Sequence, residues 1–196
     1  EITERDWSSD VCSSDLPAPD LDRMRSFLNL PCQELLLDAG GGTGRVIHQL
    51  AQETAGVLVV DISQGMLKKV VERYPDNNNY VHPLRASVNQ LPFPNEAFTR
   101  ILVVDAWHHF ADQAGAADEL VRVLAPGGRL VIGEPNGDTT GARIMSFIER
   151  LTLMYSHVST PKELANMMQD RGLSVDVQKQ GMGMTCICKK PVSLSI

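Results

Sequence analysis

The sequence predicts an α/β layer fold built on a mainly parallel sheet. Short apolar runs recur along the chain without the polar alternation of a half-exposed strand, which is typical of strands buried on both faces. Segments with helical spacing of apolar residues separate these runs. A glycine-rich turn directly follows the first run. Alternating buried strands and amphipathic helices favour parallel strands joined by right-handed crossovers.

The first predicted unit is helix, strand, glycine turn and helix. Residues 20–30 have helical spacing, with Asp20 as the cap and Pro31 at the end. The apolar run at 35–37 predicts a buried strand that ends at Asp38. Residues 39–44 form the turn, and 45–52 have apolar side chains on one side of a helix.

The middle of the chain repeats the pattern. A buried strand is predicted at 57–61, and Ser63 suits the N-cap of a helix over 63–73. A weaker strand follows near 80–84. Residues 91–94, Leu-Pro-Phe-Pro, exclude regular structure because two prolines remove donors and fix φ.

The last part completes the sheet. A strand at 101–105 precedes an amphipathic helix at 112–124, and residues 126–128, Pro-Gly-Gly, predict a turn into a strand at 129–133. Thr160 and Pro161 then mark a helix start, and Gly172 marks its end. The final strands are predicted near 173–178 and 184–189.

A single domain is predicted for residues 17–196, since 196 residues suit one core and no linker divides them. Residues 1–16 have no structural period, repeat Ser-Ser-Asp, and resemble the peptide encoded by translated sequencing-adapter DNA. We therefore expect a non-native leader that packs weakly. Residues 139–158 predict an inserted helical segment that covers the substrate or packs on the sheet.

Composition excludes several classes of protein. The net charge of −6 makes a nucleic-acid partner a poor expectation. No apolar run is long enough to cross a bilayer, and residues 1–16 lack the basic and apolar pattern of a signal peptide, so we do not expect export. The four cysteines match neither a disulfide framework nor a zinc site, which favours a cytoplasmic protein with Cys186 and Cys188 in a buried strand. The oligomeric state stays open.

The glycine turn carries most of the functional information. Residues 38–44 read Asp-Ala-Gly-Gly-Gly-Thr-Gly, so a strand ends on an acid and feeds a turn that lets a ligand approach the backbone. Ligands bind beyond the carboxyl ends of such strands. The dinucleotide pattern GxGxxG requires a third glycine where Arg45 or Ile47 stands, and the phosphate-binding GxxxxGK[ST] is absent. The acid suits a ligand with a cationic amino group.

Four motifs together resemble the class I S-adenosylmethionine-dependent methyltransferases, especially the small-molecule branch with a type 11 methyltransferase domain. They are LLLDAGGGTGRV at 35–46, VVDISQGMLKK at 59–69, LPFPNEAFTRILVVDAWHHF at 91–110 and ELVRVLAPGGRLVIGEPN at 119–136. The resemblance covers about residues 30–190 and implies a Rossmann-like, doubly wound, mainly parallel seven-stranded sheet. Helices would cover both faces, and the C-terminal strand would be antiparallel.

The resemblance also implies a binding site for S-adenosyl-L-methionine. Asp38 and Gly40 would lie near its methionine end, Asp61 would accept from the ribose hydroxyls, and Asp105 would face the methionine portion. Ile62 and Met66 would flank the adenine. Ser87 stands where the family often has an acid, which makes its contact with the adenine amino group weaker, and Val88 would offer a backbone N–H. The full expected set is Asp38, Ala39, Gly40, Gly42, Gly44, Asp61, Ile62, Met66, Ser87, Val88 and Asp105.

Several residues of these motifs could also serve the fold alone, without binding a ligand. Asp61 would cap the following helix, Asp105 would cap a turn, and Trp107 would belong to the core. His108 and His109 are adjacent and lack a third ligand, so no metal site is expected. The family often has a histidine pair at this place.

The expected reaction is transfer of a methyl group to a small, partly apolar acceptor by in-line displacement. Placing the acceptor is the main requirement, and a general base is needed only for a protonated acceptor of high pKa. His108 and His109 are the first candidates for that base, followed by Tyr155 and His157. Two alternatives stay open: a methyltransferase-like protein that binds cofactor without catalysis, and an NAD(P)-dependent oxidoreductase.

Overall fold

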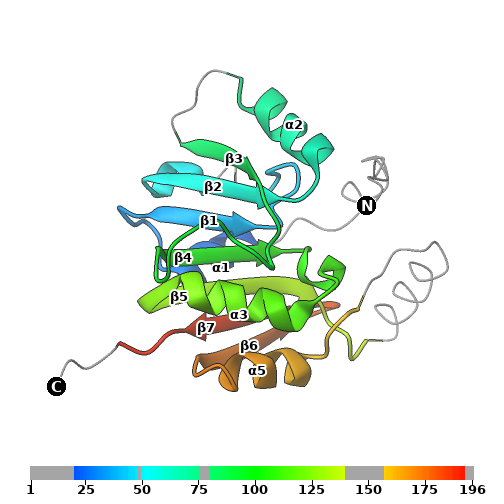
Figure 1. The fold of residues 1–196 in the computed structure, drawn as a ribbon. Coiled ribbons are helices and arrows are strands. Elements are labelled where there is room, and N and C mark those ends of the chain that lie inside the picture. Colours follow the sequence, from blue (N-terminus) through cyan, green and yellow to red (C-terminus); the bar gives the residue numbers. More distant parts are fainter. Residues whose placement is uncertain (1–19, 48–49, 76–79, 140–156, 193–196) are drawn as a thin grey trace.

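A computed structural model of the chain describes residues 20–47, 50–75, 80–139 and 157–192. Its centre is one seven-stranded sheet with the order β3-β2-β1-β4-β5-β7-β6 (Figure 1). Strands β1 to β5 pair in parallel, and β7 runs antiparallel between β5 and β6. The predicted fold class is confirmed. The strands are β1 Leu35–Ala39, β2 Gly56–Asp61, β3 Val81–Arg85, β4 Phe98–Val104, β5 Leu124–Pro135, β6 Ser174–Gln180 and β7 Gly183–Lys189.

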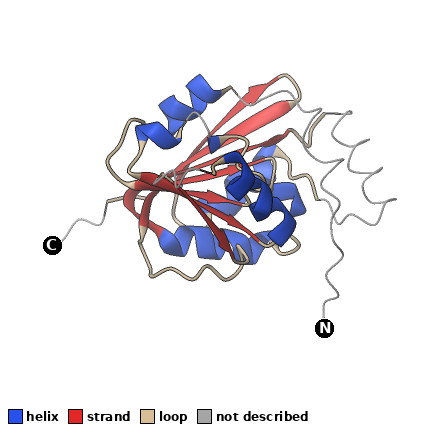
Figure 2. Ribbon diagram, turned by 90° about the horizontal axis from the view of Figure 1, so that it is seen from above, coloured by secondary structure: helices blue, strands red, loops and turns tan. Residues whose placement is uncertain are grey.

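Helices cover both faces of the sheet (Figure 2). Two hydrophobic clusters fill the two interfaces, and Trp107 is fully buried in the first of them. The first cluster lies under α3, Gln113–Val123, and α5, Pro161–Gln169. The second lies under α1, Leu21–Leu28, and α2, Gln64–Arg73. Among the described residues there are also the short 3-10 helices η2, Ala51–Glu53, and η3, Trp107–His109.

Side chains cap the predicted helix starts, as expected for Asp20, Ser63 and Thr160, and Asp112 is a further cap that was not predicted. Asp20, Ser63 and Asp112 each accept from a backbone N–H three residues later. Thr160 and Glu163 form a capping box at the start of α5, and Gly172 has φ 82° after its end. These local signals set where each helix begins.

The helix predicted over 45–52 is wrong for the residues that the structure describes there. Gly44 has a left-handed φ of 67°, and its N–H donates to Gly41. Leu50 donates to Ile47 and Glu53 to Leu50, so the bonds span three residues as in a 3-10 helix. Ile47 and Leu50 are still fully buried, because residues three apart share one side of a 3-10 turn.

The turn predicted at 126–128 is a bulge inside a longer strand. β5 continues through Pro-Gly-Gly, where Gly127 donates to the carbonyl of Lys190 and has φ 76°. The register with β4 shifts between Phe98 and Arg100 to accommodate the extra residues. A glycine with positive φ lets the chain bulge without leaving the sheet.

Two predicted segments lie outside the described residues. They are the leader at 1–16 and the inserted helix at 139–158, of which the structure describes only residues 139, 157 and 158. Within the part of the chain that the structure describes, no helix has the length and apolar character needed to cross a membrane.

Candidate functional site

Four acidic side chains mark the carboxyl edge of the parallel strands. Asp38 lies in β1, Asp61 ends β2, Asp105 follows β4, and Glu134 lies near the end of β5. Because β2, β1, β4 and β5 are neighbours in the sheet, the acids form a row along one edge. The edge therefore suits a ligand that carries positive charge.

The glycine turn lies in the middle of this edge. Gly40, Gly42 and Gly44 all have positive φ, at 74°, 55° and 67°. A Cβ on Gly40 would lie 2.7 Å from Cβ of Ala106, so the turn packs closely against the loop after β4. A Cβ on Gly42 would meet no atom within 4 Å, which leaves the backbone of the turn open on that side. This arrangement gives a ligand close access to the main chain.

Asp38 lies beneath the turn and is buried, with 2% of its surface exposed. Burial raises the pKa of its carboxyl to about 7, and the nearby charge of Asp61 adds to the rise. A Cβ on Gly41 would collide with this carboxyl group. Asp38 is therefore an acid whose charge state changes near neutral pH.

We expect Asp38→Asn to change the pH dependence of stability. The raised pKa means that the folded state binds a proton at Asp38 more tightly than the unfolded state does. This proton binding stabilises the fold at low pH, and the stabilisation is lost as pH rises from about 4 to about 7. The variant should therefore gain about 2 kcal/mol relative to wild type between about pH 5 and pH 7.5. Urea unfolding at both pH values measures this, and a difference independent of pH would contradict it.

Asp61 joins the glycine turn to the start of α2. Its two carboxylate oxygens accept from the N–H of Gly42 at 3.0 Å and the N–H of Ser63 at 2.8 Å. The helix cap itself is Ser63, which accepts from Met66. The capping interpretation of Asp61 is therefore wrong, and its carboxylate faces the turn. Burial raises its pKa, and the backbone donors oppose this rise.

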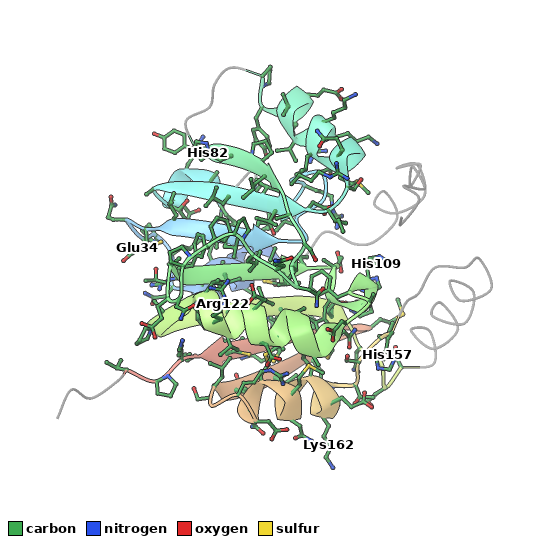
Figure 3. The ribbon with its side chains drawn as sticks, viewed as in Figure 1. Glu34, His82, His109, Arg122, His157 and Lys162 are labelled. Atoms are coloured by element: carbon green, nitrogen blue, oxygen red, sulfur yellow. The ribbon has the colours of Figure 1, made fainter. Side chains whose placement is uncertain are left out.

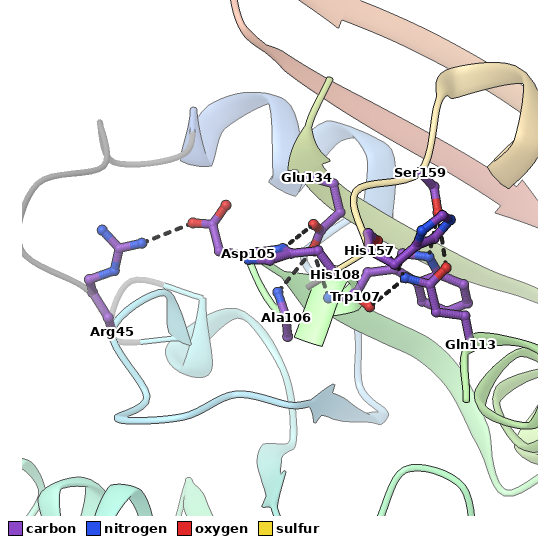
Figure 4. A network of polar contacts seen from close by, with 9 residues as sticks. All are labelled: Arg45, Asp105, Ala106, Trp107, His108, Gln113, Glu134, His157 and Ser159. Carbon is purple, nitrogen blue, oxygen red and sulfur yellow. Dashed lines mark hydrogen bonds and ion pairs between the residues drawn. The ribbon is translucent and has the colours of Figure 1, made fainter. Parts of the chain in front are cut away.

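Asp105 has a left-handed φ of 52° and forms an ion pair with Arg45 at 3.1 Å. Burial raises its pKa, and the charge of Glu134 adds to this, while Arg45 and His108 oppose it. Arg45 is the residue that replaces the third glycine of the dinucleotide pattern. It thus connects the segment after the glycine turn to the end of β4 (Figure 4).

Glu134 organises the loop after β4. Its carboxylate is 2% exposed and accepts from the N–H groups of Ala106 and Trp107 at 2.9 and 2.7 Å. The second oxygen lies 2.6 Å from Nδ1 of His108 (Figure 4). Sequence reasoning did not select Glu134, although an acid inside an otherwise apolar strand was a usable signal.

A second group of bonds ties this loop to the segment before α5. Nε1 of Trp107 donates to Ser159 at 3.3 Å, and the Ser159 hydroxyl donates to Gln113 at 3.0 Å. The N–H of His157 donates to the carbonyl of His108 at 2.9 Å. His109 and His157 both lie at the carboxyl edge (Figure 3). Tyr155 lies outside the described residues.

The residues predicted around the adenine lie at the same edge. Ile62 follows β2 and is 67% exposed, and Met66 is in the first turn of α2. The Ser87 hydroxyl accepts from the N–H of Asn89 at 3.2 Å, so it already has a local partner. Val88 is buried in the core, as is the side chain of Ala39, which leaves only their backbone groups for a ligand.

Within the described ranges, His, Cys, Asp and Glu do not gather in groups of three that could hold a metal ion. The His108 and His109 rings are 3.9 Å apart, but Nδ1 of His108 is directed at Glu134.

The chain is similar in sequence to known methyltransferases. A family model described as a methyltransferase domain matches residues 37–132. A demethylmenaquinone methyltransferase from Clavibacter sepedonicus is 36% identical over 101 residues, which are 52% of this chain and 41% of that protein. A ubiquinone/menaquinone biosynthesis C-methyltransferase from Vibrio parahaemolyticus is 29% identical over 131 residues, with coverages of 62% and 51%. The chain thus spans about half the length of the curated relatives it matches.

Solved structures support the fold. A putative methyltransferase from Bacillus halodurans superposes with a TM-score of 0.76 at 17% identity, covering 88% of this chain and 99% of that one. The [4+2]-cyclase SpnF superposes with a TM-score of 0.74 at 17% identity, covering 88% and 81%. At these identities the likeness concerns the fold alone.

Proposed function

Since residues 37–132 belong to the methyltransferase-domain family, we propose that the chain is an S-adenosylmethionine-dependent methyltransferase. The observation that carries the proposal is the contact between the glycine turn and the acid of the next strand. Gly42 donates its N–H to Asp61 at 3.0 Å, and the turn is open to a ligand at Gly42. A backbone cradle and a carboxylate therefore lie side by side at the sheet edge.

The residues present fit this cofactor. Asp61 is the proposed acceptor for the two ribose hydroxyls, and such charge-assisted bonds contribute about 1.5–3 kcal/mol each. The acids of the edge, Asp38 and Asp105 among them, complement a ligand with an ammonium and a sulfonium group. Ile62 supplies an exposed apolar side chain for the adenine.

A nicotinamide dinucleotide fits less well. Its pyrophosphate requires the free N–H groups at the start of a helix. In the described residues between Gly44 and β2, the chain forms turns and a three-residue 3-10 helix instead. Arg45, at the place of the third glycine, is engaged with Asp105.

The proposed methyl transfer depends mainly on how the protein positions the acceptor. When bound, the cofactor supplies an electrophilic methyl group on its sulfonium. The protein holds the acceptor in line with that methyl group, and positioning of this kind can lower a barrier by about 7–11 kcal/mol. His109 is the better candidate for holding an acceptor proton, because His108 is 3% exposed and fixed by Glu134.

We propose a small, partly apolar acceptor. The curated relatives named above act on demethylmenaquinone or in ubiquinone and menaquinone biosynthesis, so an aromatic quinol ring is the first acceptor to test. A ring carbon or oxygen would be the nucleophile. The free cysteines Cys32, Cys186 and Cys188 favour the reducing cytoplasm as the compartment.

The test is a transfer assay with S-adenosylmethionine and a reduced demethylmenaquinone analogue of short side chain. The expected result is an acceptor heavier by one methylene group, together with S-adenosylhomocysteine. Asp61→Ala should lose most of the rate at low cofactor concentration. Binding of S-adenosylhomocysteine without transfer to this quinol or to other phenolic acceptors would favour the cofactor-binding protein without catalysis.

A further inference from the structure

Three cationic side chains form a row across the sheet at the edge away from the glycine turn. Arg100 of β4 pairs with Arg129 of β5, and Arg129 pairs with Lys189 of β7. Residues paired directly across neighbouring strands project from the same face. This face carries α1, because Leu102 and Val131, two residues along from Arg100 and Arg129, belong to the cluster under α1.

The charges in this row lack acidic partners. Like charges directly opposite one another on neighbouring strands are destabilising. Within the described part of the chain, none of the three side chains forms an ion pair, and the ammonium group of Lys189 donates no hydrogen bond. Arg129 donates to the carbonyl of Phe27, and Nε of Arg100 is buried without a partner. The remaining donors of Arg129 and the ammonium of Lys189 are therefore available to an anion, whereas Nη1 of Arg100 donates to the carbonyl of Thr99.

A groove of about 350 Å³ lies over the end of this row. Arg129 and Lys189 line it together with Ser26, Ser174 and Phe27. Ser174 pairs with Lys189, so a hydroxyl and an ammonium lie in the same row. A volume of this size is at the lower end of sites for small molecules.

We propose that this groove binds a small phosphate monoester, with the phosphate held by Arg129, Lys189 and the two serine hydroxyls. Guanidinium and ammonium groups are the usual partners of phosphate oxygens. Asp176 also lines the groove and repels anions, so the phosphate is expected at the end where Ser174 pairs with Lys189, and the rest of the ligand is neutral or cationic. The site shares no residue with the proposed cofactor site.

The test uses the full chain with inorganic phosphate as the probe and chloride at equal ionic strength as the reference. Amide resonances of Ser174 and Lys189 should shift saturably with phosphate in the wild-type protein. Lys189→Glu should weaken this binding at least tenfold, since it replaces a charge-assisted donor with a repelling charge. Lys162→Glu, on exposed α5 at the other face, makes the same change in net charge and should leave binding unchanged (Figure 3).

Two results would overturn the proposal: equal shifts with phosphate and chloride, or the same loss of binding in both lysine variants. Titration of each variant with S-adenosylhomocysteine separates this proposal from the previous one. Both lysine variants should bind S-adenosylhomocysteine like wild type if the protein binds it at all, whatever they do with phosphate.

Discussion

Glu134→Ala is expected to lower the free energy of unfolding by about 3–5 kcal/mol. The change removes the acceptor of the Ala106 and Trp107 N–H groups and the partner of His108, all in a buried setting. Each buried donor left without an acceptor costs about 1–3 kcal/mol, and water cannot replace the carboxylate without entering the core. Urea unfolding at neutral pH measures the loss.

Glu72→Ala is the matched control, because Glu72 is an exposed acid within α2. Its effect should stay within about 0.5 kcal/mol. Equal stabilities of the two variants would show that Glu134 does not hold the loop after β4.

Glu134→Gln keeps the shape of the side chain and removes its negative charge, so it separates the contributions of the two to stability. The glutamine carbonyl can still accept from Ala106 and Trp107, so most of the stability should return. Its amide, however, donates toward Nδ1 of His108, where the carboxylate accepts. Nitrogen NMR of the His108 ring should therefore show the proton moved from Nδ1 to Nε2. An unchanged ring spectrum would contradict the assigned orientation.

Asp61→Ala is expected to weaken binding of S-adenosylhomocysteine by about tenfold to a hundredfold. The variant loses the proposed ribose acceptor and also the contacts with Gly42 and Ser63 that hold the turn against α2. The fold should persist, because Ser63 still caps the helix. Calorimetric titration gives the dissociation constants.

Asp22→Ala removes the same charge from an exposed position on α1 and serves as the control, since its side chain is 91% exposed. Its dissociation constant should match that of wild type. If Asp61→Ala also binds like wild type, the ribose assignment is wrong.

The sequence predicts most of the fold because its signals are local. Apolar runs mark the strands, and Ser63, Asp112 and Thr160 mark helix starts within a few residues of their partners. The glycine turn is recognisable because positive φ needs glycine at Gly40, Gly42 and Gly44. The doubly wound arrangement and the antiparallel end of the sheet come from the family resemblance, since no local signal specifies them, and the strand order itself was not predicted.

The errors arise where tertiary contacts decide. Apolar spacing at Ile47 and Leu50 suits an α-helix and a 3-10 turn equally, so the pattern did not distinguish them. Pro-Gly-Gly signals a turn, but pairing with β7 keeps those residues in the sheet.

The contacts of the site are less predictable still. Glu134 reaches His108 across 26 residues, and Arg45 reaches Asp105 across 60. Such pairs form only when particular strands become neighbours in the sheet. A single sequence does not specify which strands these are. His108 was the first choice as a base from its place in a motif, whereas the structure buries it beside Glu134.

Calorimetric titration of the purified chain with S-adenosylhomocysteine, with NAD as the reference ligand, tests the cofactor assignment most directly. We predict one site with a dissociation constant in the micromolar range for S-adenosylhomocysteine and no heat of binding for NAD. Binding of NAD in preference, or of neither ligand, would contradict the assignment of the glycine turn and Asp61 to S-adenosylmethionine.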